Sequence, residues 1–204
     1  MKHTRRILRA VAGPLAVLAV LVLWHPQRAE SQGSDLVAQG RQAILANKFD
    51  DALALFQKAV AADPNDPAAL VWLGNAQVRK AGTVGGMEGA AWVKRGFNTM
   101  DEAVERFPNT YVVYVVRGIM AARTPEMFKK APVAVKDLKT VLAMREKDAK
   151  SVPDAVMLNV YLHLGRAYKQ TGQSAEARAA LEKGKALFPS APEIAEVDRE
   201  LRGL

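Results

Sequence analysis

The stretch that decides the fold is ALALFQKAVAADPNDPAALVWLGNAQ, residues 52–77. It contains two alanine-rich apolar segments with the composition of helices, separated by the polar run DPNDP at residues 63–67. Proline cannot continue a helix and restricts the residue before it, so Pro64 ends the first helix. The stretch therefore predicts two consecutive helices joined by a short turn.

The spacing around this turn occurs a second time near the C-terminus. The first series is Gly40, Ala52, Phe56, Ala59 and Pro64, with gaps of 12, 4, 3 and 5 residues. The second series, with the same gaps, is Gly165, Ala177, Leu181, Gly184 and Pro189. Small residues let two helices approach closely, large residues fill the space between such contacts, and proline ends the second helix. The two series indicate an internal repeat of helical segments.

These series resemble the tetratricopeptide repeat, a 34-residue unit of two antiparallel helices, A and B. Four copies can be placed, at residues 33–66, 67–110, 111–148 and 158–191. Gly74 and Gly118 take the place that Gly40 and Gly165 take in the outer copies. The resemblance implies an all-α fold, a right-handed superhelical solenoid of helical hairpins. An amphipathic capping helix at residues 192–204 covers its end. In this register the β-branched residues 110–122, which read locally as a strand, become helix A of the third copy.

The second and third copies are longer than the repeat pattern. The extra residues lie in AGTVGGMEGAAWVKR, residues 81–95, and in RTPEMFKKAP, residues 123–132. We expect both insertions to be loops between helix A and helix B. The glycine-rich first insertion lacks the Gly-Lys-Ser/Thr sequence and the preceding strand of a phosphate-binding loop, so we interpret it as a flexible connection.

The first 31 residues differ from the rest, because they combine half of the net charge of +8 with an unbroken apolar run from Ala10 to Trp24. This run is shorter than the ~20 residues that span a bilayer and has the length of a signal-peptide core. Ala29 and Ser31 fit the small residues that precede a cleavage site. We expect residues 1–31 to be a signal peptide, or residues 10–24 to be an uncleaved inner-membrane anchor. In either case the rest of the chain is exported to the periplasmic side.

Little material for catalysis is present. The chain has no cysteine, and its three histidines are His3, His25 and His163, of which two lie in the leader. Thiolate chemistry is thus excluded, and we expect no metal site, no cofactor and no enzymatic activity. We interpret His163 as a structural helix residue. The rest of the chain is only mildly basic, so we expect no nucleic-acid partner.

The resemblance places helix A of each repeat on the concave side of the solenoid, where its polar side chains form a surface. In this sequence those residues are Arg41, Asn75, Arg79, Arg123, Asn159, Arg166 and Lys169. Because none is acidic, we expect a basic groove in an exported scaffold that binds an acidic protein or peptide. One alternative is a solute-binding module whose inserted loops close over a small anionic ligand. A plainer alternative is an ordinary solvated helix face.

Overall fold

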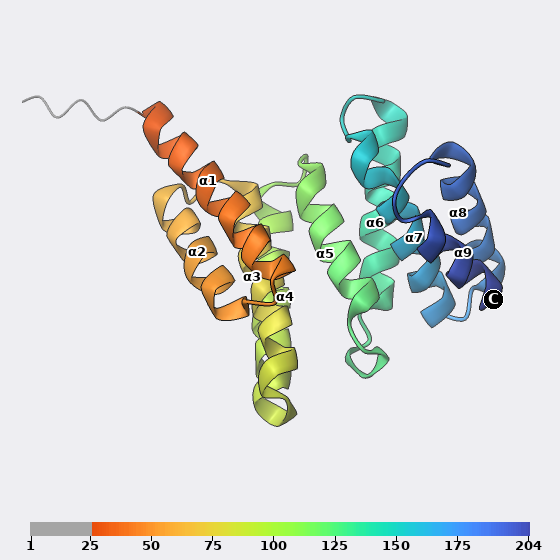
Figure 1. Cartoon of the computed structure of the whole chain (residues 1–204), viewed down its shortest axis with the longest axis horizontal. Coiled ribbons are helices and arrows are strands. Elements are labelled where there is room, and N and C mark those ends of the chain that lie inside the picture. Colours follow the sequence, from red (N-terminus) through yellow and green to blue (C-terminus); the bar gives the residue numbers. More distant parts are fainter. Residues whose placement is uncertain (1–25) are drawn as a thin grey trace, which may run out of the picture.

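The computed structural model describes residues 26–204, with side chains from residue 33 on. The described residues form helices joined by short connections, without strands (Figure 1). The elements in chain order are α1 (Pro26–Leu45), α2 (Phe49–Ala62), α3 (Pro67–Val84), α4 (Gly86–Arg106), α5 (Tyr111–Arg123), η1 (Glu126–Phe128), α6 (Ala131–Lys147), α7 (Asp154–Gln170), α8 (Ser174–Leu187) and α9 (Ile194–Arg202). The predicted all-α solenoid of helical hairpins is confirmed.

The predicted apolar run, residues 10–24, lies outside the described residues. The small residues Ala29 and Ser31 of the expected cleavage site fall within α1, which begins at Pro26. Within residues 26–204, no helix combines the length and the apolar character needed to cross a bilayer.

The helices pair into four antiparallel hairpins: α1 with α2, α3 with α4, α5 with α6, and α7 with α8. The first helices of these hairpins also contact one another in sequence, from α1 through α3 and α5 to α7. The short helix α9 packs against both α7 and α8, so it extends this row of helices by one member (Figure 1). It lies within the segment predicted to form the cap. We call the row α1, α3, α5, α7 and α9 the inner row.

Each hairpin is held by a close approach at a glycine of its first helix. A Cβ atom built on Gly40 would lie 2.6 Å from the ring of Phe56, and one on Gly165 would lie 2.6 Å from Cγ of Leu181. Phe56 and Leu181 are buried. The regular spacing in the sequence therefore corresponds to a small residue on one helix receiving a large residue from the other.

The turn in the opening stretch shows why its helices end where they do. α2 ends at Ala62, and α3 starts with Pro67, which suits the first turn because proline has no backbone N–H to leave unpaired. The Asp66 side chain caps α3 by accepting a hydrogen bond of 2.8 Å from the backbone N–H of Ala68.

The third hairpin contains a buried ion pair that sequence analysis missed. Arg117 of α5 donates two hydrogen bonds, of 2.7 and 2.8 Å, to the carboxylate of Asp137 on α6. It donates a third, of 2.8 Å, to Asp101 on α4. Burial lowers the pKa of Arg117, but the hydrogen bonds to the two carboxylates outweigh it and leave the pKa raised. This planar fork joins three helices.

The expectation that residues 81–95 form a loop is wrong. α3 continues to Val84 and α4 begins at Gly86, so the insertion lengthens both helices of the second hairpin. The turn between them needs glycine, because Gly85 and Gly86 have φ angles of 67° and 53°. Gly89 has a different role: its Cβ would lie 3.0 Å from the carbonyl oxygen of Ala81. The small residues that suggested a loop therefore let two long helices pack closely.

The second insertion does form a connection between helices. α5 ends at Arg123, the single 3-10 turn η1 follows, and Lys129 adopts the left-handed conformation with φ of 52° before α6 begins at Ala131. Both insertions extend from the same edge of the solenoid (Figure 1).

Candidate functional site

The seven residues predicted to line the concave side fall into three groups in the structure. Arg41 lies alone at the N-terminal end. Asn75, Arg79 and Arg123 lie at the middle hairpins, on α3 and α5. Asn159, Arg166 and Lys169 lie on α7. The groups differ in what their polar atoms contact.

Arg41 is exposed, and its guanidinium carbon lies 5.2 Å from the centre of the Trp72 ring. Trp72 itself stacks on Phe56 with ring centres 6.2 Å apart. This arrangement is a cation–π contact over a core aromatic cluster, and it leaves the charge of Arg41 in water.

The polar side chains of the group on α7 are hydrogen-bonded to the C-terminal segment of the same chain. Arg166 donates hydrogen bonds to Glu196, at 2.5 Å, and to Glu200, at 2.8 Å. Asn159 donates to Glu193 at 2.8 Å, and Lys169 donates to the carbonyl oxygen of Gly203 at 3.0 Å. The acceptors come from the C-terminal segment that includes α9.

The electrostatics of this contact follow from the pairing. Burial lowers the pKa of Arg166, but its hydrogen bonds to Glu196 and Glu200 outweigh this and raise the pKa overall. The hydrogen bond from Arg166 lowers the pKa of Glu196. A polar groove of about 510 Å³ beside α7 is consequently lined by both signs of charge, with Glu126, Glu196 and Glu200 facing Arg123, Arg166 and Lys169.

The seven residues predicted to form a basic groove therefore do not form one continuous positive surface, because those on α7 are bonded to the C-terminal segment. Sequence analysis missed the acidic residues of α9 because it counted only four A helices. A signal was available: three of these contacts join residues 34 positions apart, which is one repeat length. Continuing the repeat register into the capping helix would have placed these acceptors beside Arg166 and its neighbours.

The middle group has no acidic partner within hydrogen-bond or ion-pair distance among the described residues. Nε of Arg79 donates a hydrogen bond of 2.9 Å to the side-chain oxygen of Asn75, which is neutral and buried. Burial lowers the pKa of Arg79, and the nearby positive charge of Arg123 lowers it further. Arg123 is exposed, and within residues 33–204 its guanidinium has neither a hydrogen bond nor an ion pair. The charges of the two arginines thus repel each other, and the charge of Arg123 also contributes to the lowered pKa of Glu196, without a hydrogen bond or ion pair between Arg123 and Glu196.

These two arginines lie at an open groove of about 910 Å³ that both insertions line; we call it the insertion groove. Its lining residues are Phe49, Val78, Arg79, Ala81, Gly82, Thr83, Gly85, Gly86, Met87, Gly89, Ala90, Val93, Met120, Arg123, Thr124, Pro125, Met127 and Phe128. Most of these side chains are apolar, and Arg79 and Arg123 are its charged members. The two insertions were expected to act together only in the solute-binding alternative; both connect helix A to helix B in adjacent repeats, which places them on one edge.

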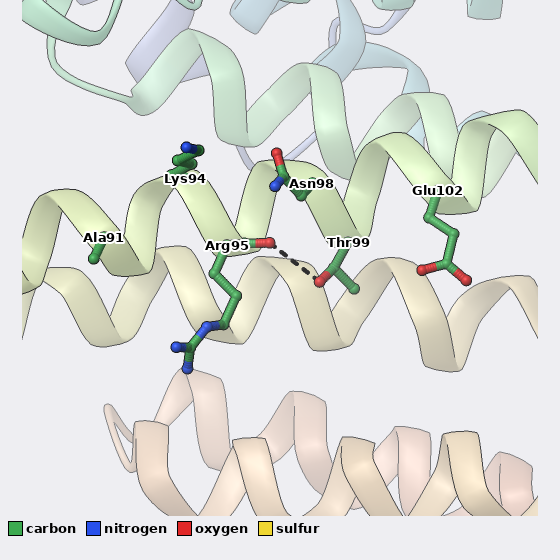
Figure 2. A pocket seen from close by; sticks show the side chains of 6 residues that line it. All are labelled: Ala91, Lys94, Arg95, Asn98, Thr99 and Glu102. Atoms are coloured by element: carbon green, nitrogen blue, oxygen red, sulfur yellow. Dashed lines mark hydrogen bonds between the residues drawn. The ribbon is translucent and has the colours of Figure 1, made fainter.

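A second surface depression lies on α4 and has different properties. Figure 2 shows Lys94, Arg95, Asn98 and Glu102 spread along one exposed face of this helix, with the hydroxyl of Thr99 bonded to the carbonyl oxygen of Arg95. Glu102 pairs with Arg106 at 3.0 Å, and Arg95 lies over the ring of Trp92. This face does not bring groups of one chemistry together, and it is an ordinary solvated helix surface.

His163 is more deeply buried than the sequence indicated. It is 3% exposed, and its Nδ1 atom has no hydrogen-bond partner within the described part of the chain. Burial, and then the positive charges of Arg166 and Arg123, lower its pKa from 6.5 to about 3. His163 is therefore neutral at physiological pH. Residues 26–204 contain no cluster of three side chains suited to bind a metal ion.

Comparisons with known proteins agree with the repeat architecture. Residues 43–81 and residues 158–190 each match a family model described as a tetratricopeptide repeat. A search of curated protein sequences gave no significant match.

Among solved structures, the chain is similar to two structures of MamA. The MamA MSR-1 structure has a TM-score of 0.57 at 21% identity, covering 85% of this chain and 83% of that one. The MamA AMB-1 structure has a TM-score of 0.54 at 20% identity, covering 87% and 80% respectively. At these identities the similarity shows the fold alone.

Proposed function

We propose that the chain is an exported, non-catalytic scaffold that binds an acidic segment of another protein through Arg79 and Arg123. Tetratricopeptide repeats are interaction modules that present extended surfaces to a partner. The observation that carries the proposal is the contrast on the inner row: Arg166 holds two carboxylates, whereas Arg79 and Arg123 hold none within residues 33–204.

The contact between α7 and α9 supports an acidic helical partner. In that contact, Arg166 on the inner row donates hydrogen bonds of 2.5 and 2.8 Å to two glutamates of a neighbouring helix. Arginine suits this task because its planar fork donates several hydrogen bonds to carboxylates at once. A partner helix placed beside α3 and α5 would supply carboxylates to Arg79 and Arg123, as α9 supplies carboxylates to Arg166.

A second candidate function is the binding of a small anionic solute. It is favoured by the size of the insertion groove, because about 910 Å³ is within the range of small-molecule sites. Apolar walls with a few charged groups are also typical of such sites. In this case the arginines would neutralise a carboxylate or phosphate of the solute.

Export is the part of the proposal that depends on residues 1–31. A phosphatase that is active only outside the cytoplasm, fused after Leu204, should be active in a Gram-negative host. A fusion from which the apolar run 10–24 has been deleted should be inactive. Equal activity of the two fusions would contradict export through this segment.

Binding can be tested by crosslinking the tagged full chain in cell envelopes and identifying enriched proteins. We expect an acidic protein to be enriched by the natural chain and lost with the double variant Arg79→Glu and Arg123→Glu. The double variant Lys94→Glu and Arg95→Glu is the matched control, because it makes the same change of charge on the solvated face of α4. Equal recovery with all three proteins would contradict the proposed use of the two arginines.

A further inference from the structure

The insertion groove has exposed apolar side chains, which the binding of an acidic group to its arginines does not explain. Met87, at the start of α4, is 91% exposed, and Met127, in η1, is 80% exposed. They belong to the two different insertions and both line the groove. Its more buried walls include Val78, Val93 and Met120. Exposed apolar surface of this kind is stabilised when a partner covers it.

We propose that the insertion groove is the docking site for an amphipathic helix of the partner protein, with its apolar face between Met87 and Met127 and its acidic residues on Arg79 and Arg123. This proposal rests on the proposed function and assigns its specificity to the two insertions. The occupant is a helix that carries both large aliphatic residues and neighbouring carboxylates.

Charge complementarity is the first argument for this occupant. Arg79 and Arg123 come from two successive inner helices, α3 and α5, and no carboxylate of the described residues pairs with either. Glu126 and Glu196 line the polar groove on the other side of Arg123. The charges of that polar groove balance, whereas both charged residues of the insertion groove are positive, so an acidic partner is attracted more strongly to the insertion groove.

The nature of the rims is the second argument. One rim is the end of the long hairpin formed by α3 and α4, and the other is the turn η1 between α5 and α6. Methionine is unbranched and polarizable, so it adapts to the side chains of a bound helix, as in other surfaces that receive apolar helices. A small anion held at the arginines would leave the outer ends of Met87 and Met127 in water, whereas a helix lying along the groove covers both.

The contact of α9 with α7 is the third argument, because it shows the geometry that acidic residues adopt on such an arginine. Glu196 and Glu200, four positions apart on one face of a helix, both bind Arg166. The same spacing on a partner helix would present two carboxylates toward Arg79 and Arg123.

The probe for the test is a fluorescent synthetic peptide of 14 residues, with leucine and methionine on one helical face and two glutamates four positions apart at its edge. A second peptide carries lysines in place of the glutamates. The full chain is reconstituted in phosphatidylcholine nanodiscs, so that no free detergent enters the groove, and empty nanodiscs give the background. Binding is measured by fluorescence anisotropy.

We expect the glutamate peptide to bind the natural chain and the lysine peptide to bind at least tenfold more weakly. The double variant Met87→Glu and Met127→Glu should lose at least tenfold in affinity for the glutamate peptide. It should keep its helical circular dichroism, since both side chains point into solvent. The control variant Lys94→Glu and Arg95→Glu should bind the peptide as the natural chain does.

Several results would overturn the assignment. Unchanged binding by the methionine double variant would show that the peptide does not bind in the insertion groove. Loss of binding in the double variant Arg79→Glu and Arg123→Glu would still support the proposed function. Failure of the natural chain to bind the glutamate peptide would contradict the helical occupant. Saturable binding of dodecanoate that only the arginine variant abolishes, without binding of the peptide, would assign the groove to a small amphiphile instead.

Discussion

Arginine side chains at two places on the inner row of helices differ in whether a carboxylate is bonded to them. At the C-terminal end, Arg166 is held by Glu196 and Glu200, and the neighbouring Asn159 and Lys169 are bonded to the same terminal segment. At the middle hairpins, Arg79 contacts only a neutral amide oxygen and Arg123 has no hydrogen bond or ion pair within residues 33–204. At the first place the arginine is bonded to carboxylates, and at the second the described residues provide no hydrogen-bonded carboxylate.

The difference indicates what each part of the chain does. A helical stack must cover the apolar face of its last repeat, and α9 does so while it also neutralises Arg166. The middle hairpins already have neighbours on both sides, so their unpaired arginines and the exposed Met87 and Met127 are not needed to close the stack. They are the part of the surface that remains available to a partner.

The largest effect on stability is expected at the ion pair within the middle hairpins, and it tests whether these hairpins are stable without an external partner. Asp137→Ala should destabilise the chain by about 3–5 kcal/mol, because it leaves the buried guanidinium of Arg117 without its main carboxylate. Urea unfolding followed by circular dichroism measures the loss. Asp101→Ala is the control and should cost much less, since the side chain of Asp101 is 47% exposed. Equal midpoints for Asp137→Ala and the natural chain would contradict the role of this pair.

The next effect concerns the hairpin that presents Arg166. Gly165→Leu should cost roughly 1–3 kcal/mol, because even the Cβ atom would approach Cγ of Leu181 to 2.6 Å and overpack the contact between α7 and α8. Gly82→Ala is the matched control on α3, where a Cβ meets no atom within 4 Å. The control should unfold at the same temperature as the natural chain or slightly above it. An unchanged melting temperature for Gly165→Leu would mean that the helices are not in the register seen here.

A third test uses the pH dependence of stability near the completed contact. The pKa of His163 is about 3 in the folded chain and about 6.5 when unfolded, so between these values the unfolded state binds the proton. Stability is therefore full above pH 6.5 and falls as the pH decreases toward 3, by about 1.4 kcal/mol per pH unit. The lowered pKa of Glu196 acts in the same direction. Urea unfolding at pH 7 and pH 5 should show a drop of about 2 kcal/mol.

His163→Leu is the variant that isolates this contribution. It removes the titrating group and its unpaired Nδ1 atom, so the drop between pH 7 and pH 5 should become much smaller. If the variant and the natural chain lose the same stability over this range, then His163 is not buried as described.

The smallest effect compares the two kinds of arginine directly. Arg166→Ala should cost about 1 kcal/mol, because it breaks charge-assisted hydrogen bonds that are partly exposed to solvent. Arg123→Ala should change stability by no more than about 0.5 kcal/mol, because it removes no hydrogen bond or ion pair within residues 33–204. Differential scanning calorimetry measures both. A loss for Arg123→Ala as large as that for Arg166→Ala would mean that Arg123 has a structural role.

Much of the fold could be predicted because the packing contacts of the repeat fix the spacing of small and large residues along the chain. Gly40 with Phe56 and Gly165 with Leu181 are the contacts that the two matching series indicated. The helical state of residues 111–123 also followed from the register, although their β-branched side chains favour a strand locally. Here the repeat pattern was stronger evidence than local propensity.

The insertions could not be predicted in the same way, because they lie outside the repeat. Glycines at positions 82, 85, 86 and 89 have the composition of a loop, and only the structure shows that two of them make a tight turn while Gly89 packs against Ala81. The pairing of Arg117 with Asp137 was also hidden, since charged residues in a helical pattern usually face solvent. Arg79 and Arg123 were among the seven residues named from the sequence, and a groove closed by the two insertions was an alternative there, but its apolar lining was not predicted.

A charge exchange at the insertion groove decides whether Arg79 and Arg123 bind the carboxylates of a partner helix. The glutamate and lysine peptides are each titrated into the natural chain and into the double variant Arg79→Glu and Arg123→Glu at physiological ionic strength. We expect the preference to reverse: the natural chain binds the glutamate peptide more tightly, and the variant binds the lysine peptide more tightly. If both proteins prefer the same peptide, the charges at the insertion groove do not select the partner and the proposal is contradicted.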